Sequence, residues 1–282
     1  MIDLHLHTTA SDGNLDPKAL VRRAYSAGIR ALSVTDHDTM TGVPVADQEA
    51  KSLGVEFVPG IEITAVFKGR DVHILGYFLH PAPHLLASFL EKQRDERLRR
   101  ARKICKSLEL LKIPIDIDNL ITDAEKNNRV ITRPVLAKAL LKAGHVKSER
   151  EAFRRWIGDG CPAYVQRQGS SPEEVVKLIS KAGGVSVLAH PGLLRKDQLI
   201  LRLVQAGLVG LEVHHPQHNE RQRVHYFELA KKNLLIASGG SDYHGDNHHN
   251  AKCLGVVGTT PKEFSLLRKR LNKIHGVVSS ER

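Results

Sequence analysis

Long apolar runs and paired cysteines are both scarce in this chain, and each absence excludes a class of protein. No apolar stretch approaches the roughly 18 residues that a membrane-spanning helix needs. The three cysteines, Cys105, Cys161 and Cys253, are odd in number and far apart, which disfavours a disulfide framework or a thiolate zinc site. The first residues lack the basic and apolar regions of a secretory signal, and no internal repeat is evident. We therefore expect a cytoplasmic protein with no membrane contact and no evident obligate protein partner.

The charged residues are unevenly divided by sign. The 282 residues include 42 Lys and Arg against 31 Asp and Glu, a formal charge of +11, with 41% hydrophobic and 26% charged residues. This composition excludes wholesale disorder, and the length allows one large α/β domain or two smaller ones. The positive balance is only weakly informative, since nucleic acid, phosphorylated metabolites or no partner are all compatible with it. The 16 histidines are an excess that needs an explanation, because histidine is the commonest metal ligand.

Strand and helix signals alternate through the first third of the chain and again through the last. Ile2, Leu4 and Leu6 alternate with polar residues at period two, which predicts a strand. Pro17 opens a helix that Gly28 ends. Similar signals predict strands at 29–35, 55–58, 61–67, 72–79, 185–189, 208–213 and 234–238, and helices at 43–53, 172–182, 197–206, 220–232 and 261–274. The alternation favours a parallel α/β domain.

The middle of the chain departs from this alternation. Helical spacing predicts one long helix over 85–111 and shorter ones at 134–143 and 149–156, with few strand signals, so residues 81–165 are predicted to form a helical insertion. The long helix is crowded with basic side chains, namely Arg94, Arg97, Arg99, Arg100, Arg102 and Lys103. We interpret them as a solvated basic face in preference to a nucleic-acid surface.

Imidazoles and carboxylates recur where the predicted strands end. His5 and His7 point to one face of the first strand, because side chains alternate at period two, and such a pair can chelate one metal ion. Any one of these residues could instead be a buried side chain with a satisfied hydrogen bond, but that does not easily explain the whole set. The candidate ligands are His5, His7, Asp12, His37, Glu62, His73, His190, Asp242 and His244. Nine ligands are too many for one ion, so we expect two or three divalent ions such as Mn, Zn or Fe.

The motifs that carry these residues resemble, in order along nearly the whole chain, those of the PHP (polymerase and histidinol phosphatase) superfamily. They are Asp3–Thr8, Ser11–Gly13, Thr35–Asp38, Gly60–Glu62, His73–Ile74, Ala189–Gly192 and Gly240–His244. The resemblance implies an α/β fold, an irregular (β/α)7 barrel, here formed by residues 1–80 and 166–282. It also implies a three-metal site: His5, His7, Glu62 and Asp242 on the first ion, Glu62, His73 and His190 on the second, and Asp12, His37 and His244 on the third. The insertion makes the chain most similar to the branch that acts on nucleoside 3′,5′-bisphosphates and short oligonucleotides.

Three further residues are candidates for contact with a substrate. Arg133, at the start of a predicted helix in the insertion, resembles the phosphate-contacting arginine of that branch and suits a phosphate on electrostatic grounds. His218 matches a family histidine near the substrate, and Arg195 follows the motif at His190. An ordinary surface role is an equal alternative for each. Glu212 is expected to face the barrel interior, where a hydrogen bond to a ligand histidine is as plausible as catalysis.

These patterns lead to one functional hypothesis and two alternatives. The hypothesis is a metal-dependent phosphoesterase that hydrolyses a phosphate monoester of a nucleoside 3′,5′-bisphosphate, or the terminus of a short oligonucleotide, by attack of a metal-bridged hydroxide on phosphorus. Arg133 would orient the phosphoryl group, and the proton for the leaving oxygen would come from His218 or water. The insertion should cap the barrel mouth and bring Arg133 toward the metals. The alternatives are a histidinol-phosphate-type phosphatase and a nucleic-acid-binding module with a structural metal site.

Overall fold

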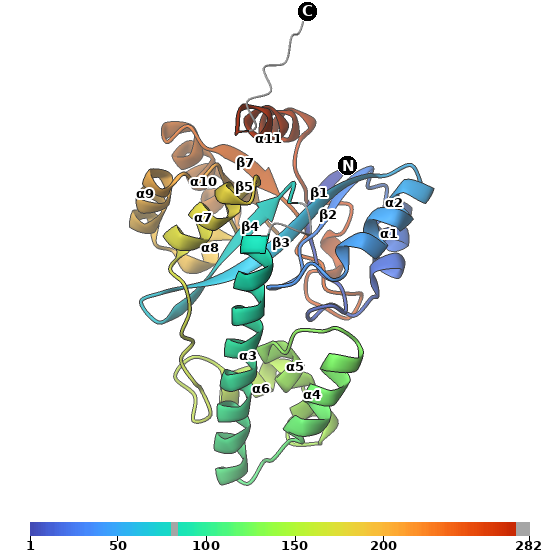
Figure 1. The fold of residues 1–282 in the computed structure, drawn as a ribbon, viewed down its shortest axis with the longest axis vertical. Coiled ribbons are helices and arrows are strands. Elements are labelled where there is room, and N and C mark those ends of the chain that lie inside the picture. Colours follow the sequence, from blue (N-terminus) through green and yellow to red (C-terminus); the bar gives the residue numbers. More distant parts are fainter. Residues whose placement is uncertain (80–83, 275–282) are drawn as a thin grey trace, which may run out of the picture.

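Seven strands form one continuous sheet whose neighbours follow the order of the chain, curled into a nearly closed barrel (Figure 1). The computed structural model describes residues 1–79 and 84–274. The strands are β1 (Ile2–Leu6), β2 (Ala31–Val34), β3 (Glu56–Phe67), β4 (Arg70–Tyr77), β5 (Val185–Leu188), β6 (Gly210–His214) and β7 (Ile236–Gly239). The predicted boundary between the barrel and the insertion, at residues 80 and 81, lies outside the described residues.

The barrel is irregular because one strand runs against the others. β4 is antiparallel to both β3 and β5, whereas the remaining pairs are parallel. Only Lys68 and Gly69 connect β3 to β4, with φ of +49° and +78°. A two-residue turn with positive φ at both positions makes a hairpin, and a hairpin forces antiparallel pairing. The expectation of a wholly parallel sheet is therefore wrong at β4, and the two strands predicted at 55–58 and 61–67 are one strand, β3.

The first and last strands of the barrel face each other across a seam instead of pairing along their length. Isolated bridges join Leu6 to Tyr243 and Ile2 to Thr259. The backbone N–H of His7 donates to the carbonyl of Tyr243 at 3.0 Å, and the carboxylate of Asp3 accepts from the N–H of Ser241, also at 3.0 Å. This seam brings the segment that follows β7 against the end of β1.

Helices cover the outside of the barrel and bury its apolar surface. They are α1 (Pro17–Ser26), α2 (Val43–Ser52), α7 (Pro172–Lys181), α8 (Pro191–Leu194), α9 (Asp197–Ala206), α10 (Glu220–Lys232) and α11 (Pro261–Ile274), with the 3₁₀ turn η2 at Ala251–Cys253. Leu20 and Val21 of α1, for example, are fully buried against Leu32 of β2 and its neighbours. None of the helices within residues 1–79 and 84–274 is long and apolar enough to cross a bilayer.

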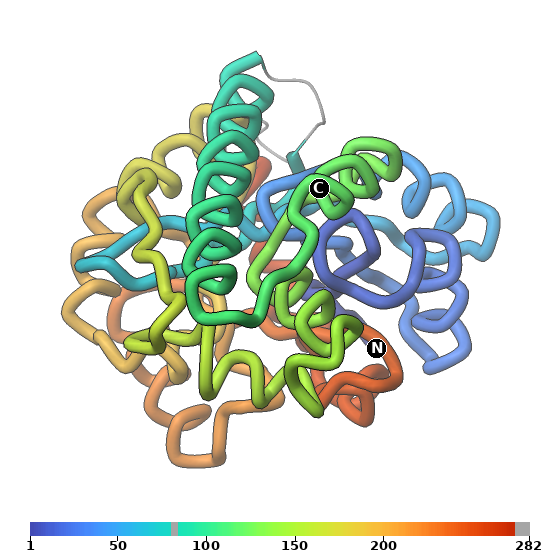
Figure 2. The backbone as a smooth tube through the Cα atoms, turned by 90° about the horizontal axis from the view of Figure 1, so that it is seen from below, coloured from blue at the N-terminus to red at the C-terminus, as the bar shows by residue number. Residues whose placement is uncertain are grey.

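The helices between β4 and β5 form a second body with an apolar core of its own. They are α3 (His84–Leu110), α4 (Ile117–Lys126), α5 (Arg133–Lys142), α6 (Glu149–Ala152) and the π-helix η1 (Phe153–Ile157). Ile104, Leu108, Leu136, Leu140 and Ile157 are buried together in this core, separately from the barrel clusters. Seen from below, these helices lie across the barrel (Figure 2). We call this body the insertion. Its helix α4 was not among the predicted elements.

Candidate active site

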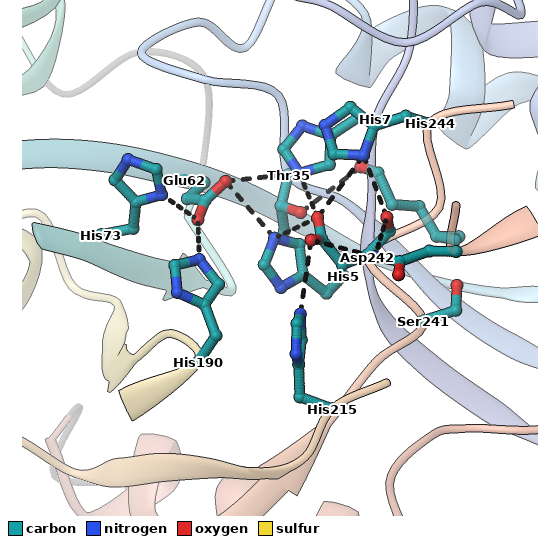
Figure 3. Close-up of polar contacts among 12 residues, drawn as sticks. His5, His7, Thr35, Glu62, His73, His190, His215, Ser241, Asp242 and His244 are labelled. Carbon is teal, nitrogen blue, oxygen red and sulfur yellow. Dashed lines mark hydrogen bonds and ion pairs between the residues drawn. The ribbon is translucent and has the colours of Figure 1, made fainter. Parts of the chain in front are cut away.

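The nine imidazoles and carboxylates singled out in the sequence lie together in one cluster. Figure 3 shows His5, His7, Glu62, His73, His190, Asp242 and His244 of this cluster. His5 lies in β1 and His7 directly follows it, while Glu62 projects from β3 and His73 from β4. The others follow strand ends: Asp12 after β1, His37 after β2, His190 after β5, and Asp242 and His244 after β7. We call these nine residues the His–carboxylate centre. Its parts come from most of the strands and the loops that follow them, so only the closed barrel assembles it.

Glu62 occupies the middle of the centre, where its two oxygens face five imidazoles. Oε2 lies 3.3 Å from Nε2 of both His5 and His7 and 3.1 Å from Nδ1 of His37. Oε1 lies 2.8 Å from Nδ1 of His73 and 3.1 Å from Nε2 of His190. Burial by itself would raise the pKa of Glu62, but the surrounding imidazoles outweigh it and hold that pKa well below its usual range. The carboxylate is therefore ionised and shared among its neighbours.

Several ring nitrogens in the centre have no hydrogen bond although they are buried. They are Nε2 of His5, both nitrogens of His7, Nδ1 of His37 and Nδ1 of His73. Unsatisfied buried polar atoms are costly, at about 1–3 kcal/mol each. Imidazole nitrogens and carboxylate oxygens held this close together are the donor set that Zn, Mn or Fe prefers. The orphaned nitrogens therefore fit a site that holds metal ions.

The geometry of the described residues groups these ligand atoms in three sets, each within 4.8 Å. The sets are His5, His7 and Asp242; His37, Glu62 and His73; and His7, Asp12, His37 and His244. They overlap the three ion sites implied by the family motifs. Two residues are added, since His37 joins Glu62 and His73, and His7 joins the Asp12 set. Two are missing, since Glu62 is not in the first set and His190 is not in the second.

The backbone of the centre is unusual at two of its residues. His190 has φ of +27° and Asp242 has φ of +48°, values that residues other than glycine rarely adopt. Such strain persists only where the surroundings hold it, and it concentrates at functional sites. Next to Asp242, a Cβ on Gly240 would lie 2.4 Å from the Cβ of His5. Glycine is therefore required where the chain passes β1.

Glu212 orients two members of the centre from behind. Its Oε1 accepts a hydrogen bond from Nδ1 of His5 at 2.8 Å, and its Oε2 accepts from the backbone N–H of His190 at 2.7 Å. Burial opposes ionisation of Glu212, but His5 outweighs it and lowers the pKa of this carboxyl to about 2. Because Nδ1 of His5 carries the donated proton, its Nε2 lone pair faces the centre. This is the hydrogen bond to a ligand histidine that we expected as one of two roles for Glu212.

His215 belongs to the same surroundings and was missed in the sequence. Its Nδ1 accepts from the N–H of Gln217 at 3.2 Å, so its Nε2 donates to Oδ2 of Asp242, 3.3 Å away (Figure 3). The side chain is fully buried. A signal was present, because His215 follows the end of β6 as the other candidates follow theirs.

His218 contacts backbone with both of its ring nitrogens. Its Nδ1 donates to the carbonyl of Val213 at 3.0 Å, and its Nε2 accepts from the N–H of Gly192 at 3.0 Å. Burial lowers its pKa, so the ring is neutral and both nitrogens are occupied by backbone. The expected contact with substrate and the general-acid role stay predictions, and in this structure both ring nitrogens are bonded to backbone. His218 instead holds the turn that carries His190.

Arg195 is not brought into the site. It adopts the left-handed conformation at the end of α8, with φ of +52°, and its Nε donates to the carbonyl of Gly192 at 3.3 Å. It lines no pocket beside the centre within the described part of the chain. The predicted substrate contact of Arg195 stays a prediction, and in this structure its Nε makes a local contact at the end of α8.

A pocket of about 380 Å³ opens beside the centre and is rich in arginine. We call it the arginine pocket. His37, His73 and His190 form its inner side, and its outer side carries Arg70, Arg97, Arg100, Arg133 and Arg167. Asp71 and Asp159 are the acidic residues that line it apart from Asp12 of the centre. Guanidinium groups in excess over carboxylates make a pocket for an anion.

Arg133 reaches this pocket from the insertion. Its Nη2 lies 3.1 Å from Oδ2 of Asp71, and its Nη1 lies 2.9 Å from Oδ1 of Asp159. Arg100 approaches the same Asp71 oxygen with Nη1 at 3.5 Å, while its own Nη2 is buried without a hydrogen-bond partner. Thr132 Oγ1, also on the pocket wall, is likewise buried and unpartnered. Arg100, Thr132 and Arg133 thus place donors in the wall of the pocket, and those of Arg133 are held by Asp71 and Asp159.

Two of the arginines expected on a solvated helix face are buried instead. Arg97 of α3 donates from Nε to Oδ2 of Asp38 at 2.7 Å, and Arg167 donates from Nη2 to the same oxygen at 2.9 Å. Burial opposes ionisation of Asp38, but both arginines outweigh it and lower the pKa of Asp38 to about 2. Arg100 is nine-tenths buried beside Asp71. The prediction of a solvated face is therefore wrong for Arg97 and Arg100. The sequence did contain a signal for their burial, because a spacing of three residues places Arg97 and Arg100 on the same face of the helix.

Comparison with known proteins agrees with this arrangement. The family model for the PHP domain matches residues 3–146. A 3′,5′-nucleoside bisphosphate phosphatase from Chromobacterium violaceum is 38% identical over 251 residues, covering 86% of this chain and 87% of that protein. A 5′-3′ exoribonuclease from Haemophilus influenzae is 34% identical over 251 residues, covering 86% of this chain and 89% of that protein.

A solved structure from Bifidobacterium adolescentis, described as a metal-dependent phosphoesterase, has a TM-score of 0.87 and 31% sequence identity, and the match covers 95% of each chain. The resemblance found in the motifs is thus confirmed at the level of sequence and of structure. This chain belongs to the PHP domain family and is a metal-dependent phosphoesterase.

Proposed function

We propose that this enzyme removes the 3′-linked phosphate of a nucleoside 3′,5′-bisphosphate and cleaves the equivalent bond at the 5′-phosphorylated end of a short oligonucleotide. The observation that carries the proposal is the arginine pocket, which opens directly beside the His–carboxylate centre. A substrate with two phosphates on one nucleoside can put one phosphate at the centre and the other among the arginines. The names of the relatives from Chromobacterium violaceum and Haemophilus influenzae support this choice of substrate.

The residues that would hold the metal ions are the nine of the centre. We assign His5, His7, Glu62 and Asp242 to a first ion, Glu62, His73 and His190 to a second, and Asp12, His37 and His244 to a third. The orphaned ring nitrogens and the central position of Glu62 support this assignment. Bound Mn, Zn or Fe would supply a Lewis acid that activates water and neutralises charge on the phosphoryl oxygens.

The protein's own groups then bind and orient the substrate. Arg133 and Arg100 bind the phosphate that is not cleaved, and Asp71 holds both guanidinium groups in place through its contacts with them. Glu212 keeps the Nε2 lone pair of His5 facing inward. Because both nitrogens of His218 are bonded to backbone, we assign the proton for the leaving oxygen to water. We further propose a cytoplasmic location, which the three unpaired cysteines support.

A substrate panel tests the proposal. The purified protein, loaded with Mn, is assayed with adenosine 3′,5′-bisphosphate, a 5′-phosphorylated pentaribonucleotide and histidinol phosphate, with phosphate release and chromatography as readouts. We expect turnover of the first two and at least about tenfold lower kcat/KM for histidinol phosphate, because that compound has no second phosphate for the arginine pocket. A preference for histidinol phosphate would contradict the proposal and favour a small-metabolite phosphatase.

A further inference from the structure

A second opening reaches the His–carboxylate centre and shares Asp12, Pro134 and Phe153 with the arginine pocket. Asp12 and His244 form its inner end, and it runs outward between the insertion and the loop after β7. Its volume is about 780 Å³, against about 380 Å³ for the arginine pocket. We call it the outer groove. Pockets of about 300–1,000 Å³ hold drug-sized ligands, so the groove has room well beyond what a single phosphate needs.

The outer groove has positive charge that no carboxylate pairs with. Lys138, Lys147 and Arg150 line it, and Glu149 is the acidic residue beside them. Nζ of Lys138 donates to the carbonyl of Asp12 at 2.9 Å and to the amide oxygen of Asn14 at 2.7 Å, both neutral acceptors. Within the described ranges, the side chains of Lys147 and Arg150 have no ion pair. The groove is therefore suited to an extended anion.

Ring faces line the same groove. His248 and His249 stand together with ring centroids 3.9 Å apart, and Phe153 lies on the wall that the groove shares with the arginine pocket. Phe153 begins the π-helix η1, an element that is often found at functional sites. A positive groove with aromatic or imidazole faces is the combination that binds single-stranded nucleic acid, since phosphates pair with the cations and bases stack on the rings.

We propose that the outer groove binds the nucleotides that follow the scissile phosphate in a 5′-phosphorylated oligonucleotide. The inference rests on the proposed function. In that reaction the oxygen of a water molecule forms a bond to phosphorus, the bond from phosphorus to the 3′ oxygen breaks, and the 3′ oxygen takes up a proton. From a bisphosphate the released group is inorganic phosphate. From an oligonucleotide it is the rest of the chain, which keeps the phosphate as a new 5′ end, and this departing chain lies in the outer groove.

The exposed side of α3 is a weaker route for the same strand. Arg97 and Arg100 are buried against Asp38 and Asp71. The exposed Arg99 and Arg102 are paired with Glu96 and Asp118 on the protein itself. Arg94 and Lys103 are exposed there without an ion pair among the described residues, but the outer groove opens on the centre and is therefore the better path for the chain.

The test compares two substrates in two double variants. K147E/R150E reverses the charge at the outer end of the groove, at exposed positions away from the centre. K103E/K106E makes the same change in net charge on the exposed side of α3 and serves as the matched control. For each, kcat/KM is measured with adenosine 3′,5′-bisphosphate and with a 5′-phosphorylated pentaribonucleotide. We expect K147E/R150E to lower the pentamer-to-bisphosphate ratio of kcat/KM roughly five- to tenfold at low ionic strength, and the control to leave it unchanged.

Binding supplies a readout independent of turnover. A fluorescent pentamer, added in EDTA and followed by anisotropy, should bind K147E/R150E more weakly than the unaltered protein and with a smaller dependence on salt. An unchanged ratio and unchanged binding would overturn the groove while leaving the proposed function intact. A ratio that falls equally in K103E/K106E would also overturn it. If the unaltered protein turns over neither substrate, the proposed function itself fails, and the groove with it.

Discussion

The barrel and the insertion meet at one site but furnish it with opposite chemistry. The barrel supplies buried imidazoles and carboxylates on strand ends, a set that attracts cations. The insertion and its flanking segments supply guanidinium and ammonium groups, a set that attracts anions. The two bodies therefore have different roles. The strands of the barrel position the reacting centre, and the helices of the insertion determine which phosphate compound binds there.

Ion pairs and hydrogen bonds between these oppositely charged groups also hold the insertion against the barrel. Arg97 and Arg133 of the insertion pair with Asp38 and Asp71 of the barrel, and Lys138 donates to the carbonyl of Asp12. Each contact lies beside the centre. A change in the barrel should therefore act on the chemical step and on metal content, whereas a change in the insertion should act on substrate binding.

The largest effect on turnover should come from Glu62, the carboxylate in the middle of the centre. Glu62→Gln removes the charge that five imidazoles share, and we expect kcat to fall by at least about 10³-fold, since several kcal/mol of charge stabilisation is lost. The measurements are kcat with saturating Mn and bound metal by elemental analysis. The folded structure should remain, as checked by circular dichroism. If the variant kept full activity although it bound less metal, the role assigned to the barrel in the chemical step would be wrong.

A large effect on stability should come from the contact between the two bodies. Asp38→Asn leaves Arg97 and Arg167 buried without their charge partner, which costs about 3–5 kcal/mol in cases where one partner of a buried pair is removed. Arg102→Ala, which breaks the exposed pair with Asp118, is the matched control and should cost less than about 1 kcal/mol. Urea unfolding measures both. Equal losses in the two variants would contradict the role assigned to Asp38.

The same pair makes a prediction about pH. Because the folded protein lowers the pKa of Asp38 from 3.8 to about 2, its contribution is fully present above about pH 4 and is lost as pH falls toward 2. Stability curves of the unaltered protein and of Asp38→Asn should therefore converge in that window. Curves that stay parallel down to pH 2 would show that Asp38 is not the group responsible.

A smaller effect on turnover is expected from the insertion's arginine. Arg133→Ala removes a contact to the bound phosphate, and kcat/KM for the bisphosphate should fall by about 10²-fold, mainly through KM if the contact is the same in ground and transition states. Arg133→Lys should recover only part of the loss, since lysine lacks the two-pronged geometry. If only kcat fell, Arg133 would act on the reacting phosphate. The insertion would then take part in the chemical step, which we have assigned to the barrel.

The smallest effect should come from Glu212, which holds His5 from outside the centre. Glu212→Gln keeps the shape of the side chain but weakens its hold on His5, and supporting changes of this kind cost about 10- to 100-fold in metal affinity. Titration with Mn measures the change, and excess Mn should restore kcat. A loss that excess Mn does not restore would mean that Glu212 takes part in the reaction itself.

The sequence predicted the barrel's contribution far better than the insertion's. Most residues of the centre lie at or near a strand end. Because side chains alternate along a strand with a period of two, the pattern at the start of the chain is enough to pair His5 with His7. The pairing of Arg97 with Asp38 spans 59 residues and two bodies, and nothing in helical spacing connects them. The direction of a ring in a loop is equally invisible, so the contact of His215 with Asp242 was not predicted, whereas His218 was singled out by the resemblance to the family alone.

The errors in the fold have local causes. β4 was expected to be parallel because the signal for its reversal, the pair Lys68 and Gly69, is only two residues long. Helix α4 begins at an Asp116 cap that accepts from the N–H of Asn119, a short-range contact in a weakly apolar stretch. Both cases show that brief turn and cap signals carry as much information as long periodic ones.

The seam between β1 and β7 has a consequence for how the protein folds during synthesis. The hydrogen bond from Ser241 to Asp3 closes a loop 238 residues long, and contacts so distant in the chain form late because ordering the intervening segment is unfavourable. During synthesis β1 precedes the other six strands, and its edge away from β2 stays uncovered until the segment after β7 has been made. Asp242 and His244 are synthesised after the strands that carry or precede the other seven residues of the centre. The complete centre therefore forms only after β7 and the segment that follows it have been synthesised.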